Sequence, residues 1–166
     1  MMMVTKQDPE EVLKEVEWPT LFFFIGLFVI VGGLEKIGVI GIVADTMVGL
    51  TRGDITIATQ LVLWVSALTT TIVNSIPYTA MMISVIHDMS DTISGNTDPL
   101  WWALSLGACF GGNGTIIGAA ANIIVAGFTQ KTKYPLRFSE YVKVGFPLMI
   151  GSVIIASVYL FVKYSL

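Results

Sequence analysis

Long apolar runs recur along this chain and restrict the solvent in which it can fold. Residues 18–34 read WPTLFFFIGLFVIVGGL, and residues 144–162 read VGFPLMIGSVIIASVYLFV. Such runs approach or reach the roughly 20 residues that a helix needs to cross about 30 Å of hydrocarbon. One run could be the core helix of a soluble protein, but 54% of the 166 residues are hydrophobic, and a soluble fold would have to bury every run at once. The sequence therefore predicts an all-α integral membrane protein.

The apolar runs predict about three spans, one re-entrant hairpin and one discontinuous helix. A first span is expected over 18–34, an interfacial segment over 37–50 and a last span over 145–162. The acidic, proline-containing start predicts a cytoplasmic surface helix over 1–17, because acidic residues stabilise the first turn of a helix. Residues 18–166 then form the membrane domain.

A helical hairpin is predicted over 55–89. The run ITIATQLVLWVSALTTTIV ends at the sequence NSIP, where Pro77 disfavours a helical conformation at Ile76. The helix resumes over 78–86, and a polar loop is expected from His87 onward. The second arm has only about a dozen residues, too few to span comfortably, which favours a re-entrant hairpin over a pair of full spans.

The sequence GGNGTIIGAAAN, residues 111–122, interrupts the apolar segment 99–128. Glycine and asparagine weaken a helix, so we expect one discontinuous helix with halves 99–110 and 115–128. Backbone groups freed at membrane depth are tolerated only where they line a cavity, meet neighbouring protein or hold a ligand. Two breaks in one chain therefore predict a shared site.

Helix ends and polar side chains at the two breaks can bind an ion or a solute. Helical halves beginning near Ile76 and Thr115 would present N–H groups to an anion, and those ending near Val73 and Phe110 would present carbonyls to sodium. Glycines spaced by four also let membrane helices pack closely, which is the alternative explanation. The predicted site residues are Thr71, Asn74, Ser75, Pro77, Gly112, Asn113, Gly114, Thr115 and Asn122. A sodium ion would use Asn74, Ser75, Asn113 and Thr115.

Enzymatic chemistry is not indicated. Twelve residues of helix, about 18 Å, would separate Ser75 from His87 and Asp88, which excludes a hydrolytic set, and both ionisable residues are expected at the membrane interface. Cys109 is the only cysteine, no metal-ligand cluster or nucleotide loop is present, and a net charge of -3 offers no basic patch to nucleic acid. We expect no catalytic residue, no metal centre and no cofactor, with sodium or a proton as the possible coupling ion.

Charges between the spans predict the orientation. The N-terminal segment carries two basic residues before the first span, and loop 129–143 carries four. The loops 45–54 and 88–98 share a single basic residue, Arg52. Positive residues accumulate on the cytoplasmic side, so the N-terminus and loop 129–143 are predicted to be cytoplasmic and the C-terminus outside or lumenal. The sequence leaves open whether the membrane is the plasma membrane or that of an organelle.

Four segments resemble the C-terminal half of permeases in the ion transporter superfamily: EWPTLFFFIGLFVIVGGLEKIGVI, WVSALTTTIVNSIPYTAMMISVI, WWALSLGACFGGNGTIIGAAANIIVAGF and FSEYVKVGFPLMI. That group includes arsenite permeases, sodium/proton antiporters, citrate carriers and the pink-eyed-dilution P protein, to whose branch the chain is most similar. The resemblance implies a fold of two inverted repeats, elevator-like alternating access and a homodimer. This chain would be the second repeat, completed by an N-terminal repeat or a partner half.

The resemblance also implies where the site lies and where this chain departs from the pattern. The hairpin tip would be Asn74 to Pro77, and the break would be Gly112 to Thr115, with Asn122 on the following half. Relatives usually have aspartate then asparagine where this chain has Asn74 and Ser75, and a neutral tip cannot accept a proton. The expected function is therefore half of a secondary transporter for an ion or small anionic solute. The alternative is a non-transporting accessory or assembly subunit with a glycine-mediated packing helix.

Overall fold

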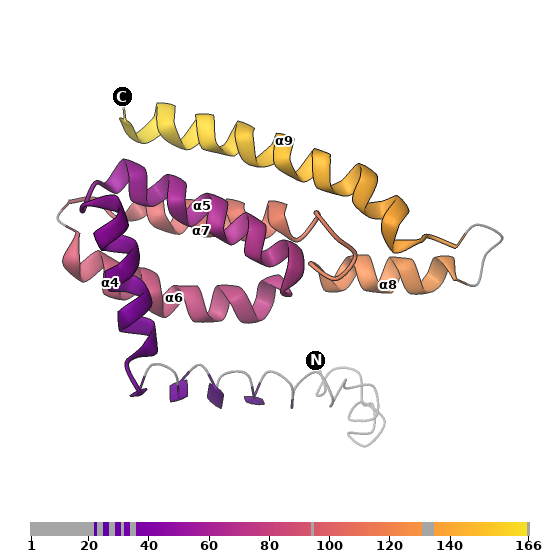
Figure 1. Cartoon of the computed structure of the whole chain (residues 1–166), viewed down its shortest axis with the longest axis horizontal. Helices are drawn as coiled ribbons and strands as arrows, with labels where there is room; N and C mark the ends of the chain where they lie inside the picture. Colours follow the sequence, from indigo (N-terminus) through magenta and orange to yellow (C-terminus); the bar gives the residue numbers. More distant parts are fainter. Residues whose placement is uncertain are drawn as a thin grey trace, which may run out of the picture.

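The computed structural model describes residues 36–93, 95–130 and 135–165, together with isolated positions between 22 and 33. Every regular element within these ranges is a helix, which confirms the all-α prediction (Figure 1). The predicted surface helix over 1–17 lies outside the described residues, and the first span over 18–34 lies largely outside them. The helices are α4 (Val39–Thr51), α5 (Ile55–Ile72), α6 (Ser75–Thr92), α7 (Asp98–Gly111), α8 (Ala120–Thr129) and α9 (Phe138–Ser165).

Two of the described helices are long and apolar enough to cross a membrane. They are Ile55–Ile72, with a mean hydropathy of 1.6, and Phe138–Tyr164, with a mean hydropathy of 2.1. Large apolar side chains also remain exposed on outer helix faces, among them Phe128 on α8 and Ile155 on α9. These features agree with an integral membrane protein whose outer faces meet lipid.

The helix α9 begins earlier than the predicted span. It starts at Phe138, and Pro147 lies inside it rather than near its start. The backbone N–H of Arg137 points to the Glu140 carboxylate at 3.4 Å, and the N–H groups of Glu140 and Tyr141 both donate to the Arg137 carbonyl. A capping arrangement of this kind starts a helix in a polar sequence, ahead of the apolar run.

The helices α5 and α6 cover the segment of the predicted hairpin, and α6 is longer than the predicted second arm. Each arm has 18 residues, joined through Val73 and Asn74 in extended conformations. The Asn74 side chain accepts a hydrogen bond from the N–H of Ile76 at 3.0 Å and caps α6. Pro77 therefore falls in the first turn of α6, where a missing N–H removes no helical hydrogen bond. Because α5 and α6 have the same length, the short second arm no longer supports a re-entrant hairpin over a pair of full spans.

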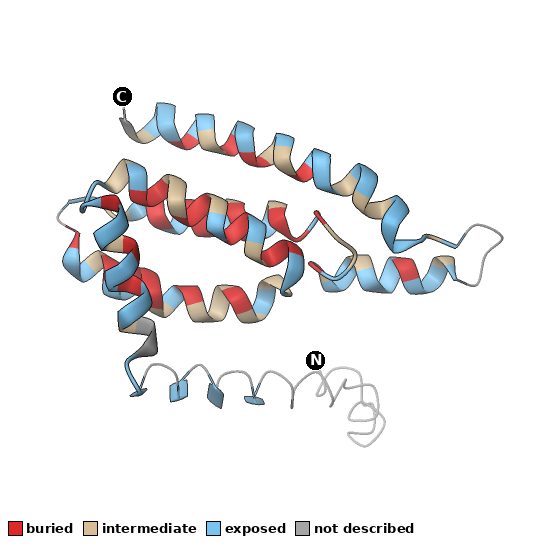
Figure 2. Cartoon of the chain, in the orientation of Figure 1, coloured by how far each residue is buried: buried red, intermediate tan, exposed pale blue. Residues whose placement is uncertain are grey.

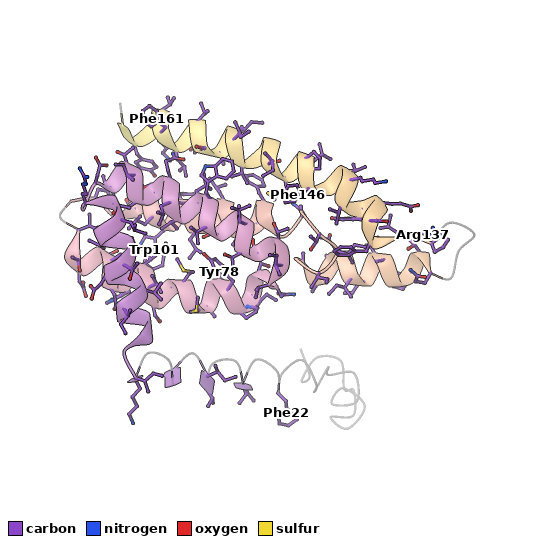
Figure 3. All side chains as sticks on the ribbon, viewed as in Figure 1. Phe22, Tyr78, Trp101, Arg137, Phe146 and Phe161 are labelled. Carbon is purple, nitrogen blue, oxygen red and sulfur yellow. The ribbon has the colours of Figure 1, made fainter. Side chains whose placement is uncertain are left out.

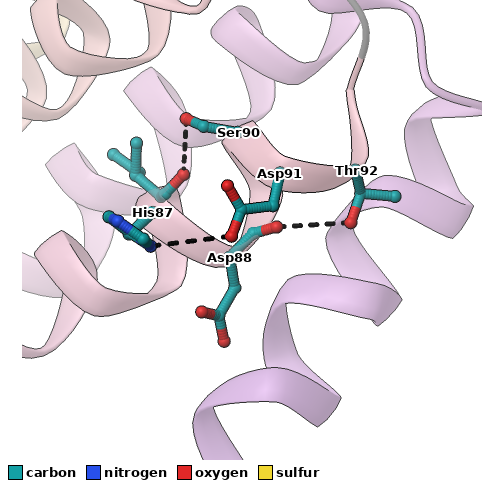
Figure 4. A network of polar contacts seen from close by, with 6 residues as sticks. His87, Asp88, Ser90, Asp91 and Thr92 are labelled. Atoms are coloured by element: carbon teal, nitrogen blue, oxygen red, sulfur yellow. Dashed lines mark hydrogen bonds and ion pairs between the residues drawn. The ribbon is translucent and has the colours of Figure 1, made fainter.

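His87 and Asp88 lie in α6, which continues to Thr92, whereas the sequence predicts a loop from His87 onward. The Nδ1 atom of His87 lies 3.9 Å from a carboxylate oxygen of Asp91, one helical turn later (Figure 4). Ser90 and Thr92 donate their hydroxyl protons back to the carbonyls of Ile86 and Asp88. The polar stretch that predicted a loop is thus an exposed, internally bonded end of a helix.

The helices α7 and α8 cover the segment of the predicted discontinuous helix, and turns separate them. Their outer limits, Asp98 and Thr129, match the predicted segment within one residue, but the second half begins at Ala120 and not at Thr115. Residues 112–119 form turns instead of helix. Figure 1 shows α8 continuing beyond the end of α7, away from the open end of the hairpin.

The core lies where α5 packs on α7, between α6 and α9 (Figure 2). Gly107 and Gly111 face α5 so closely that no side chain fits: a Cβ on Gly107 would lie 2.5 Å from the Leu63 carbonyl oxygen, and one on Gly111 would overlap the Ala67 carbonyl. Small residues allow this approach of two backbones, so the close-packing role considered for the glycines is present. Fully buried apolar side chains in the core include Leu63, Val62, Ile86, Met89, Leu100, Met149, Val153 and Leu160.

A buried hydrogen bond between Ser66 and Tyr78 joins α5 to α6, and its contribution to stability can be measured. The hydroxyls of Ser66 on α5 and Tyr78 on α6 are 3.1 Å apart, and Tyr78 lies between the arms (Figure 3). A double-mutant cycle of Ser66→Ala and Tyr78→Phe should give a coupling energy of about 0.6 kcal/mol, as is usual for such bonds between membrane helices. The measurement is equilibrium unfolding in mixed micelles. A coupling near zero would mean that the bond does not hold the arms together.

Candidate solute site at the two helix breaks

The hairpin tip and the break of the discontinuous helix are in direct contact. The Thr71 hydroxyl lies 2.8 Å from the Ala67 carbonyl oxygen and 3.1 Å from that of Gly111, so its one proton is shared between the two. The Thr115 hydroxyl donates to the Thr71 carbonyl at 2.5 Å. The N–H of Ser75 donates to the Gly118 carbonyl at 3.2 Å. Segments 40 or more residues apart in the chain therefore satisfy each other's freed backbone groups, so the two predicted breaks lie together.

Asn122 fixes the break to the first turn of α8. Its Nδ2 donates to the Gly112 carbonyl at 3.0 Å and to the Thr115 carbonyl at 3.1 Å. The Thr115 hydroxyl, besides donating, accepts from the N–H of Gly118 at 3.2 Å. The side chains of Asn122 and Thr115 thus form hydrogen bonds within and around loop 112–119 and hold it in this conformation. In this conformation they are positioning residues.

Glycine is required at the break because backbone and side chains of α5 approach it. A Cβ on Gly114 would lie 2.9 Å from the side chain of Thr71, and one on Gly118 would lie 2.7 Å from the carbonyl oxygen of Thr70. Gly118 and Thr70 were not among the predicted site residues. The four-residue spacing of the glycines was the available signal for Gly118, but it was assigned to packing alone.

Three predicted side chains keep polar groups available to a solute. Asn113 is exposed, and its Nδ2 makes only a long contact, 3.4 Å, with the Cys109 carbonyl. Asn74 uses its oxygen to cap α6 and leaves its amide NH₂, while the half-buried Ser75 hydroxyl has no hydrogen-bond partner among the described residues. Pro77 shapes the first turn of α6 and offers no polar side-chain atom.

Only some of the four side chains predicted to bind sodium are therefore free to do so. Thr115, one of its four members, already uses its hydroxyl both as donor and as acceptor. Among the described residues, no three His, Cys, Asp or Glu side chains gather in a way that would hold a metal ion. The side-chain groups left at the tip and the break are the uncharged Asn74 NH₂, Ser75 hydroxyl and Asn113 amide, which can bind an anion or a neutral polar solute.

Open cavities flank the break on two sides. One, of about 520 Å³, lies between Asn113 and the start of α9. The other, also about 520 Å³, lies between α6 and α7 and reaches Ser75 and Cys109. Both have the volume of small-molecule sites and are lined mostly by apolar side chains. The first cavity is lined by Asn113, Leu136, Glu140, Tyr141, Val144, Gly145, Leu148, Met149 and Ser152.

Comparison with known proteins identifies the family. The citrate transporter family matches residues 1–107. The chain is 39% identical over 166 residues to an uncharacterized transporter of Mycobacterium tuberculosis, covering 99% of this chain and 39% of the relative. It is 38% identical over 171 residues to the P protein of Mus musculus, covering 99% of this chain and 20% of the relative. A 46 kDa membrane protein of Mycobacterium leprae is 36% identical, also over 39% of its length.

These relatives confirm the resemblance to the P protein branch. No solved structure matches the chain. The chain spans about two fifths of the first mycobacterial relatives and a fifth of the P proteins. The matching proteins are transporters or membrane proteins by name, and they point away from an enzyme. The chain belongs to the citrate transporter family.

Proposed function

We propose that this chain is the C-terminal half of a secondary active transporter that moves an ion or small anionic solute by alternating access. The observation that carries the proposal is the joining of the two breaks, in which Thr71 bonds Gly111 and Thr115 bonds Thr71. A membrane helix can be interrupted where the interruption lines a cavity or holds a ligand, and here two interruptions meet beside two cavities.

The chemistry of the tip favours an anionic or neutral solute. Asn74 and Ser75 bring no charge, and the free Asn74 NH₂ and the Ser75 hydroxyl can donate hydrogen bonds to a solute. The N-cap residue of α8, Ala119, provides no side-chain cap, so the first N–H groups of the helix carry partial positive charge toward the break. Sodium or a proton remains the proposed coupling ion.

The proposed hairpin is re-entrant. Its tip ends level with the end of α7, whereas α8 and the first turns of α9 extend further along the long axis of the molecule (Figure 1). A hairpin placed in this way enters and leaves on the side where α9 ends. By the distribution of basic residues that side is outside or lumenal, and the loop between α8 and α9 is cytoplasmic.

The opposite wall of the site is proposed to come from a second, inverted repeat. The chain spans only 39% of its mycobacterial relatives, which leaves room in a complete carrier for such a repeat. Midplane sites of inverted-repeat transporters lie between the two repeats. A homodimer of the complete carrier is the proposed assembly.

A packing subunit without transport activity is the second candidate, because Gly107 and Gly111 do pack against α5. The two proposals differ at Asn113, whose exposed side chain contributes nothing to the contact between α5 and α7. Only the transporter requires this side chain.

Replacing Asn113 with alanine in the complete carrier should lower uptake into vesicles by about tenfold or more, the effect of losing a hydrogen bond to a charged solute. Membrane insertion should be unchanged. Gln130→Ala, at the exposed end of α8, is the matched control. Wild-type uptake by the Asn113 variant would remove that residue from the site and favour the packing subunit.

A further inference from the structure

Three aromatic rings surround Lys163 near the end of α9. The Lys163 Nζ lies 5.2 Å from the ring centroid of Trp102, 5.5 Å from that of Tyr159 and 5.1 Å from that of Tyr164. Trp102 belongs to the start of α7, so the four residues, here called the Lys163 cluster, join two helices at one end of the molecule. Figure 3 shows Phe161 at this end of α9.

The length of α9 and the residue types of the Lys163 cluster suit the depth of lipid headgroups. The apolar segment Phe138–Tyr164 has 27 residues, which makes it about 40 Å long as a helix, while the hydrocarbon of a bilayer is about 30 Å thick. One or both ends of α9 must therefore reach the headgroup region. Tryptophan and tyrosine concentrate there, and lysine extends its ammonium toward the same layer.

Among the described residues, no carboxylate forms an ion pair that would neutralise the positive charge of the cluster. In the part of the chain that the structure describes, the one ion pair within 4.0 Å joins His87 and Asp91, both on α6. Asp98, four residues before Trp102 on α7, makes no such pair with Lys163. Aromatic faces attract a cation but carry no net charge, so they orient the ammonium without cancelling it.

Every polar side chain of the cluster can donate a hydrogen bond. The ammonium has three N–H donors, each phenol has an O–H, and the indole has an N–H. A ligand that complements this set is an anion with several acceptor oxygens. Exposed apolar side chains on α9, Ile155, Val158 and Val162, recur at helical spacing toward the cluster and offer a surface for hydrocarbon.

We infer that the Lys163 cluster binds the phosphate headgroup of an anionic phospholipid whose acyl chain lies along Ile155, Val158 and Val162. The apolar stripe selects a lipid over a free phosphate, because soluble phosphate gains nothing from it. Under the proposed orientation, this lipid belongs to the outer or lumenal leaflet. The inference does not depend on whether the protein transports a solute.

The test is lipid retention by the purified protein, measured by native mass spectrometry with phosphatidylglycerol or phosphatidylcholine added. The wild-type protein should retain phosphatidylglycerol preferentially, and Lys163→Gln should reduce that retention about fivefold, the contribution expected of one basic residue at an anionic surface. Retention of phosphatidylcholine should not change. Lys163→Arg should behave as wild type, and so should Lys143→Gln, which removes an exposed lysine near the other end of α9.

Two outcomes would overturn the inference. Equal retention of phosphatidylglycerol by the wild-type protein and by Lys163→Gln would show that the cluster does not bind the headgroup. Displacement of the lipid by millimolar inorganic phosphate would assign the cluster to a soluble anion instead. Lys163 is exposed, and circular dichroism of each variant checks that the fold is intact.

Discussion

Gly111→Leu should separate α7 from α5 and destabilise the protein by more than the roughly 1–3 kcal/mol of ordinary overpacking. A Cβ at this position already overlaps the Ala67 carbonyl and the Thr70 hydroxyl. Neither neighbour can retreat, because the carbonyl belongs to the α5 backbone and the Thr70 hydroxyl donates to Ser66 at 2.7 Å. Leucine adds three further carbon atoms to the same space.

The measurement is unfolding of the purified protein in mixed micelles, followed by circular dichroism. Gly151→Leu is the matched control, since Gly151 lies on the exposed side of α9 and a Cβ there would meet nothing within 4 Å. The control should unfold as the wild type does. If both leucine variants unfold at the wild-type denaturant concentration, the close approach of α5 and α7 is not a feature of the folded protein.

Thr115→Val should abolish transport by the complete carrier while most of the fold survives. Valine keeps the shape of threonine but removes the hydroxyl, which leaves the Thr71 carbonyl without this donor and the Gly118 N–H without this acceptor. Each unpaired buried group costs about 1–3 kcal/mol, so the loop 112–119 should open readily. Both the hairpin tip and the break would then lose the geometry that the proposed solute site requires.

Two measurements test the Thr115→Val variant. Amide hydrogen exchange over 112–119 should become faster, and uptake into vesicles should fall to background. Thr115→Ser restores the hydroxyl and should restore both readings, whereas Thr46→Val, which removes an exposed hydroxyl on α4, should change neither. Wild-type exchange rates in Thr115→Val would show that the hydroxyl does not hold the break in place.

Local sequence patterns predicted α5 to α9 and both breaks, but they misjudged where α6 ends and where α8 and α9 begin. Pro77 was interpreted as an interruption, although Asn74 caps α6 before it and places the proline in the first turn. The polar residues after Ile86 suggested a loop, because composition does not show which acceptors their hydroxyl groups bind. In the folded chain, Ser90 and Thr92 bond carbonyls one turn earlier and extend the helix.

The roles within the candidate site depended on distant partners and were not predictable in the same way. Thr115 was expected to begin a helix, but its hydroxyl bonds a carbonyl 44 residues earlier in the chain, and the helix starts only at Ala120. Asn122 looked like a ligand for the solute, yet its amide closes the loop on Gly112 and Thr115. Only the arrangement of α5 against α7 separates these positioning residues from Asn113.

The bonds between hairpin tip and break also impose an order on biogenesis. Thr71 leaves the ribosome 44 residues before Thr115, so at about 5–20 residues per second the hairpin waits about 2–9 s for its partner. During that interval the Thr71 carbonyl lacks the hydroxyl donor, and the Ser75 N–H lacks the carbonyl acceptor, that later satisfy them. The nascent hairpin must spend those seconds in the insertion machinery, at the membrane surface or beside another segment that shields these groups from lipid.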